Sequence, residues 1–79
     1  MNETERVVHS FTKNSREDVV ARLNTFRGLE LAYLRVYVHD ELGDARPTPK
    51  GVSIRVEQLP ELRAAVDALI AAHEERLAA

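Results

Sequence analysis

Hydrophobic and polar residues alternate along the chain up to about residue 56, most regularly between Leu29 and His39. One set of alternate positions in this segment is apolar and the other is mostly aromatic and basic. The two sets are Ala32, Leu34, Val36 and Val38, and Leu31, Tyr33, Arg35 and Tyr37. Because successive side chains of a strand point to opposite faces, the pattern predicts a strand with one core face and one aromatic, basic face.

Weaker alternation predicts three more strands within about residues 6–56. Residues 7–13 form the first, and residues 18–26 the second, although a helix is an open alternative for the second. The Pro-Thr-Pro segment at 47–49 precedes the last alternating residues, and proline cannot donate to a strand ladder. We therefore expect an irregular, exposed approach to Lys50 and Gly51, followed by the fourth strand.

From Gln58 onward the hydrophobic period becomes helical and predicts a helix over about residues 58–77. The apolar stripe consists of Leu59, Leu62, Val66, Leu69, His73 and Leu77. Its spacing suits packing against another helix, and proline at position 60 fits a first helical turn. The predicted fold class is α+β, with a four-stranded antiparallel sheet followed by one C-terminal helix (ββββα).

With 79 residues, the chain is expected to form a single domain, 1–79, that leaves much of its surface in water. Sharing a core with a second copy would relieve this exposure, and Leu62, Val66, Leu69 and His73 are the expected dimer contacts. One helix covers only one face of a sheet, so the other face is exposed to water, covered by a partner or used as a binding surface. An acidic N-terminal segment and the lack of a long apolar run predict a cytoplasmic protein, nucleoid-associated if bacterial, without a membrane partner.

The sequence lacks the residues that several kinds of catalytic and metal site require. The chain has no cysteine and no HExxH, GxSxG or GxxxxGK[ST] motif, and its histidines are isolated. We therefore expect no enzymatic activity, catalytic residue, metal, cofactor or small-molecule substrate.

The charge is divided unevenly along the chain, whose net charge is -2. Residues 6–56 carry nine Lys or Arg against six Asp or Glu, whereas residues 57–79 carry two against five. Any binding of nucleic acid must therefore use a local patch on the predicted sheet rather than the total charge.

Four runs in the sequence resemble, in order and spacing, the bacterial branch of the transcriptional coactivator family positive cofactor four. They are Phe-Arg-Gly at 26–28, Leu-Arg-Val-Tyr at 34–37, Pro-Thr-Pro-Lys-Gly-Val-Ser-Ile at 47–54 and Glu-Gln-Leu-Pro-Glu-Leu at 57–62. The resemblance covers roughly Phe11 to Ile70. It implies a curved sheet, a two-fold dimer, grooves for two antiparallel single DNA strands and no catalysis.

Carried over by position, the resemblance implies roles for individual residues. Phe26 becomes the base-stacking aromatic, Arg27 a backbone cation beside it, and Arg35 the central groove cation. Lys50 and Gly51 form a close-approach hairpin contact. The remaining candidates are Tyr37, which lies beside the usual second aromatic position, and the secondary cations Arg22 and Arg55.

The expected function is thus a homodimeric, sequence-nonspecific binder of single-stranded DNA, with RNA left open, that holds melted strands in transcription regulation or DNA maintenance. Leu29, Val38 and Pro49 replace residues that the family usually supplies for contact. They motivate the alternative of a protein-interaction or structural dimer with weakened or lost DNA binding. Two simpler interpretations also stay open. Phe26 and Tyr37 could be half-buried residues of the sheet without a binding role, and Arg35 could form an ion pair with Glu30 or a helix carboxylate.

Overall fold

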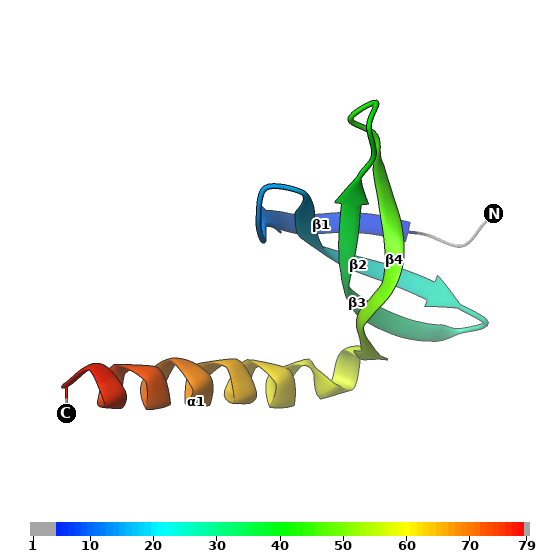
Figure 1. Cartoon of the computed structure of the whole chain (residues 1–79). Coiled ribbons are helices and arrows are strands. Elements are labelled where there is room, and N and C mark those ends of the chain that lie inside the picture. The colour runs from blue at the N-terminus through cyan, green and yellow to red at the C-terminus, as the bar shows by residue number, and fades with distance from the viewer. Residues whose placement is uncertain (1–4, 79) are drawn as a thin grey trace.

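The computed structural model describes residues 5–78, which form a four-stranded sheet and a C-terminal helix (Figure 1). The elements are β1 (Glu5–Thr12), β2 (Glu17–Phe26), β3 (Leu29–His39), β4 (Ala45–Arg55), a 3-10 turn η1 (Val56–Gln58) and α1 (Leu59–Ala78). The predicted ββββα order is confirmed, and the second segment is a strand rather than a helix. The sheet order is β1-β2-β3-β4, with every neighbouring pair antiparallel.

β4 begins earlier than predicted, at Ala45, and contains the two prolines. An edge strand tolerates them because one side of its backbone has no ladder partner. The expected irregularity is present, since three residues at 48–50 lie between the pairs Tyr37–Pro47 and Arg35–Gly51, opposite only Val36. This widened stretch brings β4 back into register at Gly51.

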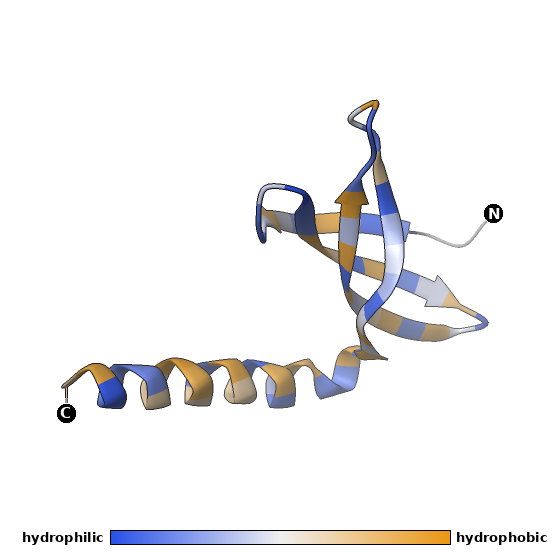
Figure 2. Ribbon diagram, viewed as in Figure 1, coloured by the Kyte–Doolittle hydropathy of each residue, from blue (hydrophilic) through white to orange (hydrophobic). Residues whose placement is uncertain are grey.

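The strand register separates two faces of the sheet, because directly paired residues share a face. The apolar face contains Val19, Ala21, Leu23, Ala32, Leu34, Val36, Val52 and Ile54. The polar face contains Arg22, Phe26, Tyr33, Arg35, Tyr37, Gly51 and Arg55. Figure 2 shows the corresponding alternation of hydrophobic and hydrophilic residues along the strands.

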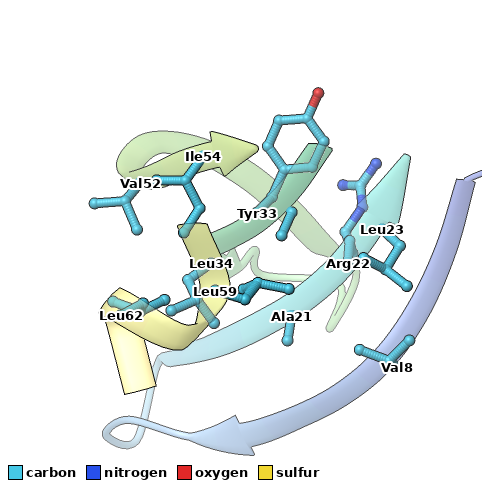
Figure 3. Close-up of a pocket in the computed structure, with 11 residues that line it drawn as sticks. Val8, Ala21, Arg22, Leu23, Tyr33, Leu34, Val52, Ile54, Leu59 and Leu62 are labelled. Carbon is cyan, nitrogen blue, oxygen red and sulfur yellow. The ribbon is translucent and has the colours of Figure 1, made fainter. Parts of the chain in front are cut away.

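α1 extends away from the sheet, and its first residues lie nearest to the strands (Figure 1). Leu59 and Leu62, in its first turn, line a hollow together with apolar side chains of the sheet (Figure 3). Further along the helix, Leu69 and Leu77 are 70% and 72% exposed. No helix in the described part of the chain is long and apolar enough to cross a membrane.

Apolar surface is left open throughout the described structure. No hydrophobic side chain among residues 5–78 is buried. The accessible surface is 6427 Å², whereas a compact monomer of 8.9 kDa exposes about 4,800 Å². The radius of gyration is 15.2 Å, against about 11.6 Å for a compact chain of this length. Residues 5–78 therefore form an extended body without a closed core.

Candidate nucleic-acid interface

Two cations and two aromatic rings form a connected cluster on the polar face. The Arg22 guanidinium lies 6.0 Å from the centroid of the Tyr37 ring, and its Nη1 donates a hydrogen bond to the Tyr37 hydroxyl. The Arg35 guanidinium lies 5.7 Å from the centroid of the Tyr33 ring. These contacts hold flat rings and positive charges side by side on adjacent strands, which are the two features that single-stranded nucleic acid requires of a nonspecific binder.

Arg35 is held without being neutralised by a carboxylate. Its Nη1 donates to the carbonyl oxygen of Thr48 at 3.0 Å, and the Thr48 hydroxyl in turn donates to the carbonyl oxygen of Val36 at 2.7 Å. The ion pairs found within residues 5–78 are Lys13–Glu17, Arg22–Glu5, His39–Asp18 and Arg46–Asp40. The alternative in which Arg35 pairs with Glu30 or with a helix carboxylate is therefore wrong.

Phe26 and Arg27 lie at the tip of the β2–β3 hairpin. Arg27 and Gly28 form its two-residue turn with φ of 53° and 79°, as a type I′ turn requires. Only Gly28 adopts such a conformation freely, so Arg27 is in a conformation that is uncommon for a residue with a Cβ. Its guanidinium lies 5.2 Å from the centroid of the half-exposed Phe26 ring. The turn thus presents an aromatic ring and a cation together at the edge of the polar face.

Gly51 pairs directly with Arg35, and Lys50 beside it is exposed. A Cβ at Gly51, where φ is 142°, would lie 2.2 Å from the carbonyl oxygen of Leu34. The close approach at Gly51 is thus between the backbones of β4 and β3. The two strands leave no room for a side chain at this point.

The secondary candidates, Arg22 and Arg55, also lie on the polar face but differ in solvent exposure. Arg22 is only 15% exposed, because it contacts Tyr37 and forms an ion pair with Glu5. Arg55 is exposed opposite Leu31 at the end of β4. The two candidates therefore differ in how far they are open to an incoming phosphate.

The three positions that depart from the family pattern fall in different places. Leu29 pairs with Phe26 beside the hairpin turn, and Pro49 lies in the widened stretch of β4. Val38 alternates with Tyr37 and so faces the apolar side of the sheet. Val38 therefore does not interrupt the cluster of rings and cations.

Two residues at this surface were absent from the sequence-based candidates. Tyr33 and Glu5 line one hollow of the polar face together with Arg22, Arg35 and Pro47. The alternation of Tyr33 with Arg35 and Tyr37 already placed this ring on the correct face. Glu5 gave no such signal, because only the β1–β2 register brings it near Arg22.

The far end of the sheet carries acidic and polar groups. His39 Nε2 and Asp18 Oδ2 lie 2.9 Å apart across β3 and β2. In the β1–β2 turn, a hydrogen bond from Asn14 Nδ2 at 2.8 Å lowers the pKa of Glu17 below its usual value of 4.5, with a smaller effect from Lys13. No group of three or more His, Cys, Asp or Glu side chains among residues 5–78 is placed to hold a metal ion.

The fold and this surface define a class of small ββββα proteins in which one basic, aromatic face of the sheet is open. A family profile described as "Transcriptional Coactivator p15 (PC4)" matches residues 13–65. The chain belongs to this family, a non-enzymatic DNA-binding family associated with single-stranded DNA, and its resemblance to positive cofactor four is confirmed.

Solved structures similar to this chain include two homologs of PC4. A PC4 homolog from Burkholderia pseudomallei has 27% sequence identity and a TM-score of 0.76, covering 90% of this chain and 93% of its own. A bacteriophage T5 homolog of the eukaryotic coactivator PC4, implicated in recombination-dependent DNA replication, has 20% identity and a TM-score of 0.65. Its alignment covers 94% of this chain and 83% of the phage chain, and it supports the fold alone. No curated protein sequence matches this chain significantly.

Proposed function

We propose that the chain, acting as one domain, binds single-stranded DNA without sequence preference and holds melted strands during transcription regulation or DNA maintenance. The observation that carries the proposal is the Arg35 environment. This cation lies against the Tyr33 ring, bonds to a neutral carbonyl group and retains its full charge for a phosphate. Phe26 and Arg27 extend the surface at one end, and Lys50 at the other.

The physical roles follow from the two kinds of surface that a single strand exposes. The rings of Phe26, Tyr33 and Tyr37 stack with bases at about 1–3 kcal/mol per base, whatever the base. Arg27, Arg35 and Lys50 contact phosphates and displace counterions. Their positions in the β2–β3 turn, in β3 and in β4 suit a strand of nucleic acid that crosses the sheet.

We further propose that the functional unit is a homodimer in which a second copy covers α1 and the apolar face. The subunit exposes about 1,600 Å² more than a compact monomer of its mass, similar to the area that one partner buries in a large permanent interface. Leu62, Val66, Leu69 and His73 lie along the helix and form the central contact. Such a dimer presents the polar face twice.

A titration of a labelled oligonucleotide of about 20 nucleotides tests the proposed binding. We expect saturable binding that weakens linearly with salt on logarithmic axes, and stronger binding of single strands than of duplex. RNA of the same sequence, measured in parallel, establishes whether the 2′-hydroxyl matters. A dimer that shows no binding at low salt would instead support a protein-interaction or structural role on the same scaffold.

A further inference from the structure

One hollow of the polar face is lined by Arg22, Tyr33, Arg35, Pro47 and Glu5. Among the described residues that line it, Glu5 is the only one with a carboxylate. We propose that this hollow is a subsite for a backbone phosphate of the nucleic acid, and that Glu5 occupies it when no ligand is bound. The inference rests on the proposed function and extends it to the regulation of the same surface. Glu5 is then an internal competitor of the ligand.

The chemistry of the contact is that of a phosphate mimic. A carboxylate and a phosphodiester each carry one negative charge on two terminal oxygens, and a guanidinium fork binds either of them. Glu5 Oε2 pairs with Arg22 Nη2, whereas Arg22 Nε is buried and has no hydrogen-bond partner within residues 5–78. The carboxylate therefore leaves one donor of the guanidinium without a partner.

The two partners of the ion pair differ in how firmly they are held. The Arg22 guanidinium is fixed by the Tyr37 hydroxyl and ring and is 15% exposed, whereas the Glu5 side chain is 51% exposed. Glu5 also belongs to the last pair of the edge strand β1, opposite Asn24, and terminal pairs of this kind open at low cost. Departure of Glu5 therefore leaves the cation in place.

The register explains why one phosphate would meet both cations. Arg22 pairs with Tyr33, and Val20 pairs with Arg35, so the two arginines are diagonal neighbours on adjacent strands. Side chains in this relationship lie within reach of a common group. A phosphate in the hollow thus replaces Glu5 at Arg22 and also gains the field of Arg35.

A double-mutant cycle on the full chain tests the competition. At low salt, Glu5→Gln should bind a labelled single strand of about 20 nucleotides about two- to fivefold more tightly, the range for losing one partly exposed ion pair. Arg22→Gln should bind more weakly than the parent. In the Arg22→Gln background, the further change Glu5→Gln should have little effect, because the cation for which it competes is gone.

The control is Glu75→Gln, which makes the same change of charge on the helix and should leave the affinity nearly unchanged. An equal gain from Glu5→Gln with and without Arg22 would indicate a long-range charge effect and overturn the proposal. A parent that binds DNA while Glu5→Gln binds no better would overturn it and leave the proposed function intact. If neither the parent nor any variant bound DNA, both the competition by Glu5 and the proposed DNA-binding function would be contradicted. Circular dichroism verifies folding, and Arg22→Met replaces Arg22→Gln if the latter unfolds.

Discussion

The Arg35 guanidinium donates a hydrogen bond to the carbonyl oxygen of Thr48, 3.0 Å away, across the widened stretch of β4. This bond orients the side chain without cancelling its charge, because a carbonyl group carries no net charge. It uses one of the five N–H groups of the guanidinium and leaves the others for an incoming anion. The strand irregularity around Thr48 thus serves to position a cation.

Replacing both Arg35 and Lys50 with Ala should weaken binding of single-stranded DNA. The dependence of log K on log salt should become shallower by about 0.7 for each phosphate that the variant no longer neutralises. Anisotropy titrations at several salt concentrations measure this slope, and light scattering should show the same oligomeric state as the parent. A double variant that binds as tightly as the parent would show that the residues that bind DNA lie elsewhere.

Phe26→Ala should lower the affinity for single strands by about 1–3 kcal/mol, the value of one stacked base. Phe11→Ala is a control of matched exposure, because Phe11 is 54% exposed and Phe26 47%, while Phe11 pairs with Val19 and so lies on the apolar face. Because the proposed dimer covers that face, light scattering verifies that the control keeps the oligomeric state of the parent. We expect the control to bind nearly as the parent does in the same assay. Equal losses from both variants would point to destabilisation rather than to stacking.

The sequence predicts the elements better than it predicts the contacts between them. β3 follows directly from its alternation and α1 from its stripe, because each pattern depends on neighbouring residues alone. The beginning of β4 is not predictable in the same way, since proline is excluded from central strands but accepted at an edge. Whether β4 lies at the edge depends on the sheet order.

In the candidate site, too, the sequence predicts which residues share a face but not which residues contact each other across strands. Tyr33, Arg35 and Tyr37 share a face by simple alternation and were placed together correctly. The Arg35–Thr48 bond depends on a register shift, and the Arg22–Glu5 pair depends on residues 17 positions apart meeting across two strands. Such pairings are set by the fold as a whole.

Gly51→Ala should destabilise the protein by about 2–6 kcal/mol, through backbone strain and through the clash with the Leu34 carbonyl oxygen. Gly43→Ala is the matched control, because Gly43 also has a positive φ of 87° but no atom within 4 Å of an added Cβ. The control should lose only the cost of the strain, about 1 kcal/mol. Urea denaturation at one protomer concentration compares the two, and equal losses would contradict the role of the close approach.

The pKa of Glu17 should lie below its usual value of 4.5 and rise toward it in Asn14→Ala, which removes the hydrogen bond that contributes most. Lys13→Ala should raise the pKa less. A pKa that is lower in the folded state stabilises the protein above the unfolded value, and this contribution is lost as the pH falls through the folded value. An NMR titration of the Glu17 carboxyl carbon measures the pKa in each variant. A larger rise in Lys13→Ala than in Asn14→Ala would show that Lys13, and not the Asn14 hydrogen bond, contributes most to the lowered pKa.

Leu69→Asp should convert the proposed dimer to a monomer or an unfolded chain. The Leu69 side chain is 70% exposed in the single subunit, so the substitution costs little there, whereas enclosing a carboxylate under a partner helix costs several kcal/mol. Leu42→Asp is the control, because Leu42 is 87% exposed in the β3–β4 turn and should tolerate the charge. Light scattering with circular dichroism separates a folded monomer from an unfolded chain. A folded dimer of Leu69→Asp would exclude the middle of α1 from the interface and direct attention to the apolar face of the sheet.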